Sequence, residues 1–336
     1  MPAGKLHIGV LGTARIADAL VTAIKKSSNC ELMAVASRDE QKALSWAQER
    51  DVPHHFGSYE DLLGSDLVDA IYIPLPNGLH KEWSLKAAGN HKHVLCEKPI
   101  GTSAQDVEEL IAARDKYGVV IMEAFMYRFH PQTARIRQLL ADRAIGDIKI
   151  ARATFDFYLK RPNDVRWDPQ LGGGALADVG CYCASILTLV AGTAPTAVTA
   201  SAVWGQSGVD TSLVGTLEFP GDLLGIMDCS FQVGSTMQQW LQISGTEGLI
   251  KLERPFSPDG IDATIIVDKV DGTSEPEHVH VTGANQYQLM VEHFARAALE
   301  GHPLSYPLED SLVNMRVLDA LLEAAHSGQR VKVEDH

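Results

Sequence analysis

The first third of the chain alternates regularly between short apolar runs and amphipathic segments, and this alternation constrains the fold more than any other feature. The apolar runs, each the length of a buried strand, are residues 6–11, 32–36, 68–73, 94–96 and 119–122. The segments with helical spacing between them are residues 16–24, 39–50, 80–88 and 103–111. Parallel strands need crossover connections, usually helices, so this order predicts an α/β fold with a doubly wound parallel sheet.

The pattern changes near residue 124. The later apolar runs alternate with polar residues and are separated by turn sequences, which is typical of hairpins. These runs are residues 148–159, 196–204, 213–219, 223–231, 238–244 and 249–253. They predict an α+β region with a mostly antiparallel sheet, a helix over 176–190 and two helices near the C-terminus. Because 336 residues exceed one ordinary core, we expect two domains, 1–124 and 125–336.

Composition excludes several classes of partner. The formal net charge of −14 argues against nucleic acid and anionic membranes. The apolar runs stay short of the roughly 18 residues that span a bilayer, and a strand beginning at Leu6 leaves no room for a signal peptide. The five cysteines fit reduced thiols, and Cys181 and Cys183 are too close in sequence for a zinc knuckle. We therefore expect a cytoplasmic protein with no bound metal.

Lys98 follows the predicted strand at residues 93–96 and precedes Pro99. Proline fixes its own φ near −65° and restricts the residue before it to an extended backbone. Open α/β sheets bind ligands at the carboxyl ends of their strands. A lysine there can be structural, but the constraint on Lys98 favours a chemical role.

The first predicted strand ends in a glycine turn that opens a helix. Compared with the G-x-G-x-x-G/A fingerprint, the chain has Gly12-Thr13-Ala14-Arg15-Ile16-Ala17, with alanine in the middle position. That position lets the backbone approach a pyrophosphate, so alanine weakens the match without excluding it. The place of the turn between a strand and a helix favours dinucleotide binding over an ordinary turn.

Ser37 and Arg38, at the end of the second strand, indicate which dinucleotide binds. An acidic residue is expected there for the ribose of NAD, whereas a guanidinium pairs bidentately with a 2′-phosphate. Lys42, one helical turn later, adds positive charge. Asp39 argues weakly against this interpretation, although it also suits a helix N-cap. We predict NADP as the cofactor.

A proline- and glycine-containing loop follows the strand that ends at residue 73, on the same predicted sheet edge as Lys98. We expect its residues Pro76, Asn77 and His80 to contact the cofactor at the ribose and the nicotinamide. The alternative is an ordinary loop in which His80 simply begins a helix.

Three glycines at 172–174 lead into an apolar helix that carries Asp178 and Tyr182 on one face. A tyrosine on such a helix is commonly a core residue, but an acid one turn away, after a glycine-rich entry, favours a site. Arg166 and Trp167 precede the glycines. We expect them to line the cofactor or substrate pocket, and a surface ion pair is the alternative for Arg166.

At these residues the chain resembles the glucose–fructose oxidoreductase/inositol dehydrogenase/MocA (GFO/IDH/MocA) family over nearly its whole length. The matching segments are residues 12–17, Pro76-Asn77-x-x-His80, Glu97-Lys98-Pro99 and Gly173-Gly174-x-Leu176-x-Asp178. Many members carry a histidine four residues after the aspartate, where this chain has Tyr182. Together with residues 123–131, this departure resembles the branch of dimeric dihydrodiol dehydrogenases and NADP-dependent D-xylose (aldose) 1-dehydrogenases.

The resemblance implies a Rossmann domain, with Glu97 among its cofactor contacts, and an open-faced sheet domain for substrate binding and homodimerisation. It also implies a catalytic pair, Lys98 and Tyr182, meeting over the nicotinamide ring. A phenol titrates near pH 10, and a nearby ammonium favours the phenolate. We therefore expect Tyr182 to act as general base, Lys98 to lower its pKa and bind the reacting oxygen, and Asp178 to orient sugar hydroxyls.

The expected activity is NADP-dependent hydride transfer between nicotinamide and a sugar or polyol carbinol, with C1 of an aldose such as D-xylose or glucose preferred. A trans-dihydrodiol dehydrogenase and a ketoreductase of a modified sugar are alternatives. A different class of function is a non-catalytic, NADP-binding regulator of a sugar pathway, against which the intact Lys98 and Tyr182 argue.

Overall fold

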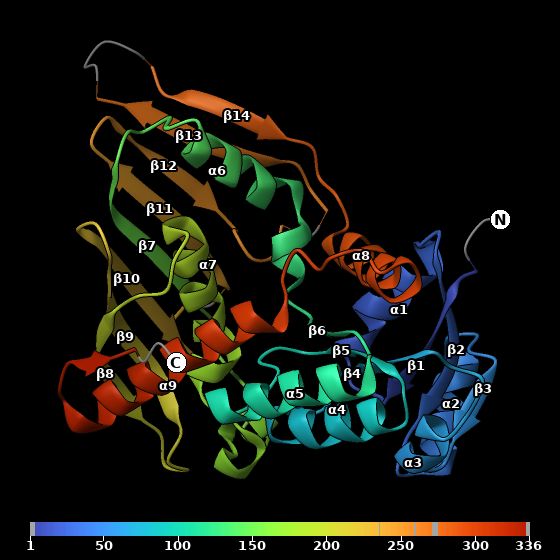
Figure 1. Ribbon diagram of the computed structural model, residues 1–336. Coiled ribbons are helices and arrows are strands. Elements are labelled where there is room, and N and C mark those ends of the chain that lie inside the picture. Colours follow the sequence, from blue (N-terminus) through green and yellow to red (C-terminus); the bar gives the residue numbers. More distant parts are fainter. Residues whose placement is uncertain (1–3, 235, 259, 271–274, 334–336) are drawn as a thin grey trace. The chain divides into compact units, whose positions relative to one another are not determined.

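The computed structural model describes residues 4–234, 236–258, 260–270 and 275–333 (Figure 1). Residues 1–3, which entered the expectation about a signal peptide, lie outside this part. The chain forms two compact units, one of Met1–Met126 with Asn285–Leu312 and one of Tyr127–Ala284 with Val313–His336. The first unit therefore takes in a segment from near the C-terminus. The division into domains 1–124 and 125–336 remains a prediction.

The first unit is built on a parallel sheet whose described strands have the order β3-β2-β1-β4-β5-β6. These strands are β1 (Leu6–Leu11), β2 (Cys30–Ala36), β3 (His54–Phe56), β4 (Ala70–Ile73), β5 (His93–Cys96) and β6 (Ile121–Glu123). This is the doubly wound Rossmann order, in which ligands bind where the strand order reverses, here between β1 and β4. The predicted fold class is confirmed.

The helices of the first unit are α1 (Ala17–Lys26), α2 (Glu40–Glu49), α3 (Tyr59–Leu63), α4 (His80–Gly89), α5 (Ala104–Tyr117) and α8 (Gln286–Glu300). The Ser103 hydroxyl caps α5 by accepting a hydrogen bond from the Asp106 amide at 3.3 Å. Neither β3, with 3 residues, nor α3, with 5, was predicted, because segments this short show no clear period.

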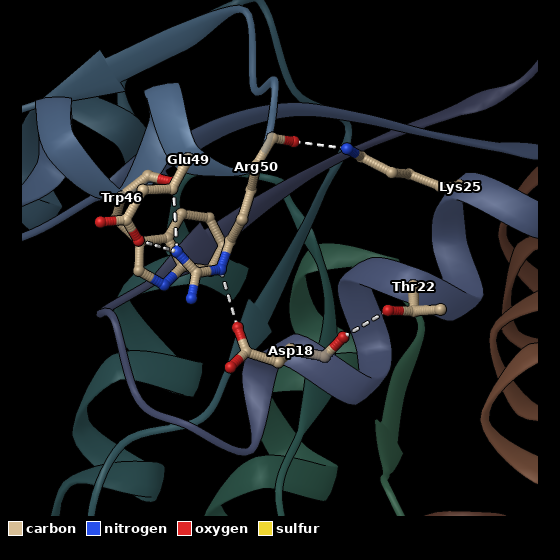
Figure 2. A network of polar contacts seen from close by, with 6 residues as sticks. All are labelled: Asp18, Thr22, Lys25, Trp46, Glu49 and Arg50. Carbon is tan, nitrogen blue, oxygen red and sulfur yellow. Dashed lines mark hydrogen bonds and ion pairs between the residues drawn. The ribbon is translucent and has the colours of Figure 1, made fainter.

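Polar contacts around Arg50 link the first turn of α1 to the end of α2 (Figure 2). The Arg50 Nε donates to Asp18 Oδ1 at 2.7 Å, and its guanidinium lies 4.5 Å from the ring centroid of Trp46. Its carbonyl oxygen accepts from Lys25 Nζ at 2.5 Å. Asp18 stands near the beginning of α1, shortly after the glycine turn, so these contacts hold that end of the helix in place.

The second unit contains a sheet whose described strands have the order β14-β13-β12-β11-β7-β10-β9-β8-β15. They are β7 (Ile148–Asp156), β8 (Ala197–Trp204), β9 (Asp210–Phe219), β10 (Leu223–Ser230), β11 (Gln238–Gly245), β12 (Gly248–Glu253), β13 (Ala263–Lys269), β14 (Glu277–Val281) and β15 (Val331–Lys332). Strands β7 and β10 are parallel, and the other described pairs are antiparallel. The predicted mostly antiparallel sheet is confirmed. Strands β13, β14 and β15 were not predicted; most residues of β14 are polar or exposed, and β15 has 2 residues.

The helices of the second unit lie against this sheet. They are α6 (Pro131–Ala141), a π-helical turn (Leu176–Gly180), α7 (Cys181–Ala191) and the greater part of α9 (Leu308–Ser327). The helical stretch Pro169–Ala191 is long and apolar enough to cross a membrane by composition, which the sequence reading did not anticipate. Of its apolar window, 72% is buried inside the protein, as in a core helix. Cys181 and Cys183 are buried, reduced cysteines within it.

Candidate functional site

The turn after β1 has a conformation that glycine alone adopts easily. Gly12 has φ +97°, and a Cβ added to it would lie 3.0 Å from Leu75 Cδ2 and 3.4 Å from the Tyr59 hydroxyl. Its amide donates to the Ala36 carbonyl at 2.8 Å. Residues Thr13, Ala14, Arg15 and Ile16 then connect the turn to α1. A dinucleotide pyrophosphate can approach a backbone of this kind at the start of a helix.

Ser37 and Arg38 leave the neighbouring strand β2 at the same sheet edge. Ser37 is buried, and its hydroxyl accepts from the Asp39 amide at 3.3 Å. The Asp39 carboxylate caps α2 by accepting from the Lys42 amide at 3.1 Å. The acid that argued against NADP therefore serves as a helix cap.

Arg38 is exposed, and its guanidinium lies near Tyr59, a residue of α3 that the sequence reading missed. Burial raises the pKa of Tyr59, and the Arg38 guanidinium opposes that rise. The hydroxyl of Tyr59 faces Gly12. The Tyr59 hydroxyl and the Arg38 guanidinium therefore both lie near the glycine turn.

His80 begins α4 and is 0% exposed. Its Nδ1 lies 2.7 Å from the Pro99 carbonyl oxygen and its Nε2 lies 2.7 Å from that of Leu75. A ring nitrogen could contact a cofactor only by leaving one of these carbonyls. The structure thus matches the alternative in which His80 begins a helix, and cofactor contacts of Pro76, Asn77 and His80 remain predictions.

Acid is expected to destabilise the fold through His80. Burial lowers its pKa to about 4 in the folded protein, although the carbonyls of Pro99 and Leu75 favour the protonated ring. Between that value and the ordinary pKa near 6.5, the unfolded chain binds a proton that the folded chain excludes. The free energy of unfolding should therefore decrease as pH falls through this range, by about 3 kcal/mol in total.

Urea unfolding at several pH values between 7 and 4 would measure this effect. Other groups also titrate, and the raised pKa of Asp156, about 7, acts with the opposite sign. The comparison is therefore wild type against His80→Gln, whose stability should decrease less in acid. Equal pH dependence of the two proteins would contradict the assignment.

Lys98 is partly buried directly after β5 and is joined to Pro99 by a cis peptide bond. The preceding Glu97 is buried, and its Oε1 accepts from the Tyr72 hydroxyl at 2.6 Å. Burial and the Glu97 carboxylate together raise the pKa of Tyr72 well above its usual value, so this phenol stays protonated and donates. The sequence reading missed Tyr72, which appeared only as an apolar strand residue.

In the second unit, Tyr182 and Asp178 lie at the junction of the π-helical turn and α7. Tyr182 is 5% exposed, and its ring centroid lies 5.3–5.9 Å from those of Phe256, Phe155 and Tyr127. π-Helical turns are rare in proteins, and those that occur often lie at functional sites. The junction therefore holds the tyrosine ring in an aromatic environment with an acid nearby in sequence.

Arg166 joins this cluster through its guanidinium. Its Nε donates to Asp178 Oδ2 at 2.5 Å and its Nη1 donates to Asp164 Oδ1 at 3.0 Å. Trp167 packs edge-on against Phe231, with centroids 5.4 Å apart. Arg166 thus forms an ion pair, which was the alternative to a pocket-lining role. Its partner is Asp178, the acid that we expect to orient substrate hydroxyls. Pocket-lining roles for Arg166 and Trp167 remain predictions.

The glycines before this helix bring the backbone close to other parts of the chain. A Cβ at Gly173 would collide with the Arg166 carbonyl, and one at Gly174, which has φ +119°, would collide with the Asp210 carboxylate. Asp210 Oδ2 accepts from the Leu176 amide at 2.7 Å. The glycines are therefore explained at least partly by packing within the unit.

Arg128 and Tyr127 also hold α7, and the sequence reading did not assign them this role. The buried hydroxyl of Ser185, one turn after Tyr182, lies 2.8 Å from the Tyr127 hydroxyl and accepts from Arg128 Nη2 at 2.9 Å. In the sequence they were noted only as part of residues 123–131, a segment that contributes to the family resemblance.

The structure therefore gathers the predicted residues into two groups. Within the first unit, Gly12, Arg38, the loop before His80, and Lys98 follow β1, β2, β4 and β5 at the carboxyl edge of one parallel sheet. Within the second unit, Asp178 and Arg166 are paired, and Tyr182 is one helical turn away. The meeting of Lys98 with Tyr182 remains a prediction.

Two family models match the chain. An oxidoreductase family with an NAD-binding Rossmann fold matches residues 6–125, and the GFO/IDH/MocA C-terminal domain matches residues 133–251. Together they cover more than two thirds of the sequence.

The chain is also similar to proteins of known name. It is 38% identical over 330 residues to D-xylose 1-dehydrogenase (NADP(+)) 2 of Haloferax volcanii, covering 98% of this chain and 100% of the relative. It is 34% identical over 322 residues to trans-1,2-dihydrobenzene-1,2-diol dehydrogenase of Xenopus laevis, covering 94% and 96%. A solved 3-ketoreductase of Actinomadura kijaniata, in complex with NADP and TDP-benzene, matches with a TM-score of 0.90 at 28% identity, covering 96% and 98%.

Proposed function

Because the chain belongs to the GFO/IDH/MocA oxidoreductase family, we propose that it is an NADP-dependent dehydrogenase acting on a sugar or polyol carbinol. C1 of an aldose such as D-xylose or glucose is the preferred reacting carbon, as the name of the Haloferax relative supports. The structural observation that carries the proposal is the sheet edge at which Gly12, Arg38 and Lys98 follow β1, β2 and β5.

The first unit fits an NADP cofactor. Gly12 offers a backbone surface where a Cβ would meet Leu75, and the exposed Arg38 supplies a guanidinium at the end of β2. Backbone amides at the start of α1 suit the pyrophosphate, and Arg38 with Ser37 and Lys42 suits the 2′-phosphate. When bound, the cofactor accepts or supplies a hydride at the nicotinamide.

Removal of the Arg38 guanidinium should weaken NADP binding selectively. In Arg38→Ala, loss of charge-assisted hydrogen bonds to the 2′-phosphate is expected to raise KM for NADP roughly 10- to 100-fold, while KM for NAD changes little. Steady-state kinetics with each cofactor measures the ratio, and Lys42→Ala should show a smaller effect. An unchanged KM for NADP in Arg38→Ala would remove the cofactor assignment.

In the proposed reaction, residues of this chain transfer the hydroxyl proton and bind the reacting oxygen. During oxidation Tyr182 takes the hydroxyl proton as the carbinol carbon loses hydride, and during reduction it returns that proton. Lys98 donates a hydrogen bond to the reacting oxygen and favours the tyrosinate form of Tyr182. Asp178, oriented by Arg166, accepts hydrogen bonds from substrate hydroxyls.

The Actinomadura ketoreductase supports this pair of roles. Its solved variants include one with a tyrosine replaced by phenylalanine and others with a lysine replaced by alanine or glutamate. The replaced lysine and tyrosine stand the same number of positions apart as Lys98 and Tyr182. This spacing makes Lys98 and Tyr182 the counterparts to test first.

A substrate screen at fixed NADP concentration tests the proposal. Aldoses, polyols and trans-dihydrodiols would be offered with NADP, and keto sugars, free and nucleotide-linked, would be offered with NADPH. The highest kcat/KM on an aldose supports the preferred function. A highest value on a dihydrodiol or a keto sugar favours the alternatives that the Xenopus and Actinomadura proteins represent. Tight NADPH binding without turnover of any compound would instead favour a regulator.

We also infer a homodimer formed through one face of the second sheet. Cross-strand register places Val203, Val214, Leu224 and Trp240 on the same face, and each is at least 37% exposed. Large apolar side chains gathered on one sheet face are typical of an interaction surface, and self-association is the commonest use of such a surface. Sedimentation equilibrium measures the oligomeric state. A cytoplasmic location likewise stays a prediction.

A further inference from the structure

Buried polar side chains from different elements hold the main chain on both sides of Lys98. His80, at the beginning of α4, contacts the Pro99 carbonyl at 2.7 Å. Glu123, the last residue of β6, accepts the Ile100 amide at its Oε1 at 2.9 Å. The loop formed by residues 97–100 is thus fixed by side chains that lie in other parts of the sequence of the same unit.

Glu123 is the least expected of these residues. It is 1% exposed, and its second oxygen, Oε2, accepts from the Tyr306 hydroxyl at 3.0 Å. Tyr306 lies 183 positions later in the chain and packs edge-on against Phe125, with centroids 5.7 Å apart. Each carboxylate oxygen therefore has a donor, one from the Lys98 loop and one from the C-terminal segment of the unit.

The sheet itself does not require this carboxylate. Strands β5 and β6 pair through their main chains, with Cys96 opposite Glu123 and the Ala124 amide donating to the Cys96 carbonyl at 2.7 Å. A buried carboxylate costs more desolvation free energy than an apolar side chain of similar size at the same place. Its presence is therefore better explained by the loop that it holds than by the stability of the strands.

We propose that Glu123, oriented by Tyr306, is a positioning residue that sets the place of the Lys98 ammonium by fixing the loop after it. The inference rests on the proposed function, in which Lys98 contacts the reacting oxygen. Misplacement of a catalytic group by about 1 Å can cost on the order of 100-fold in rate, so a residue that fixes its loop has a measurable effect.

The test compares Glu123→Leu, which removes both acceptor oxygens at similar volume, with Glu123→Gln, which keeps an acceptor for the Ile100 amide. We expect kcat to fall by roughly 10- to 100-fold in Glu123→Leu, with KM for NADP nearly unchanged, and to recover largely in Glu123→Gln. Leu110→Ala, a buried substitution on α5 of the same unit, controls for lost stability and should lower Tm without lowering kcat of the folded fraction.

A second readout does not depend on turnover. Lys98 is partly exposed, and its acylation rate by acetic anhydride, measured by mass spectrometry as a function of pH, reports the placement of its ammonium. We expect the pH dependence of Lys98 acylation in Glu123→Leu to differ from that in wild type and in Leu110→Ala. If wild type turns over no sugar or diol but the profile still differs, the positioning inference stands and the proposed function fails.

Unchanged acylation of Lys98 and unchanged kcat in folded Glu123→Leu would overturn the inference, leaving Glu123 with a structural role alone. If Glu123→Leu does not fold, Tyr306→Phe provides the test of the positioning role, because it removes one hydroxyl and keeps the ring against Phe125. We expect a fall in kcat of roughly 3- to 10-fold, the equivalent of one ordinary hydrogen bond. Kinetics and Lys98 acylation like those of wild type in Tyr306→Phe would equally contradict the proposal.

Discussion

The Tyr182→Phe variant is expected to lose about 10²- to 10⁴-fold in kcat, the usual contribution of a general acid or base, while its affinity for NADPH stays nearly unchanged. The substitution removes one hydroxyl and keeps the ring that packs against Phe155 and Phe256. Stability should therefore change little. Steady-state kinetics with the preferred substrate and NADPH fluorescence titration measure the two quantities.

Tyr127→Phe is the matched control for this variant. Tyr127 lies 5.9 Å from Tyr182 between ring centroids, and its hydroxyl is 2.8 Å from that of Ser185. Loss of that contact should disturb α7 slightly without removing the proton donor. Near wild-type turnover in Tyr182→Phe would show that the proton follows another route.

The Lys98→Met variant is expected to lose roughly 10²- to 10³-fold in kcat, because methionine keeps most of the length of the side chain and removes the ammonium that contacts the reacting oxygen. The pH profile should also move. Without the ammonium, the pKa of the general base rises, so the residual activity should increase toward higher pH.

The exposed Lys116 on α5 provides the control, since Lys116→Met removes an equal charge from the surface of the same unit. Its kcat and pH profile should match those of wild type. A Lys98→Met variant that keeps both the turnover and the pH profile of wild type would confine Lys98 to a structural role.

Much of the fold could be predicted from local patterns. The apolar runs of β1, β2, β4 and β5 are short, bounded by turns and followed by helical periodicity, so their order alone indicated a parallel sheet. The placement of α8 could not be predicted in this way. It packs beside α1 in the first unit (Figure 1), and the side-chain Nδ2 of Asn29 donates to the main-chain carbonyl of Glu292 at 3.0 Å, a contact between distant parts of the chain.

The candidate site residues also differ in whether they could be predicted from local sequence patterns. Gly12, Arg38, Lys98 and Tyr182 stand out because each lies at a recognisable position, such as a strand end or a helix after glycines. Glu123 also stands at a strand end and begins the run 123–131, but neither feature indicates which groups its carboxylate contacts. Its significance comes only from the Tyr306 hydroxyl and the Ile100 amide that its two oxygens accept.

The sequence alone determined the alternation of strands and helices in the first unit and the residue types that can bind a dinucleotide and transfer a proton, since these depend on neighbouring residues and their periodicity. Only the tertiary structure decided which polar groups are buried and which groups they contact. It placed both ring nitrogens of His80 against main-chain carbonyls and paired Arg166 with Asp178. The reason is physical, because a hydrogen bond depends on distance in space, and folding brings together donors and acceptors that the chain order separates.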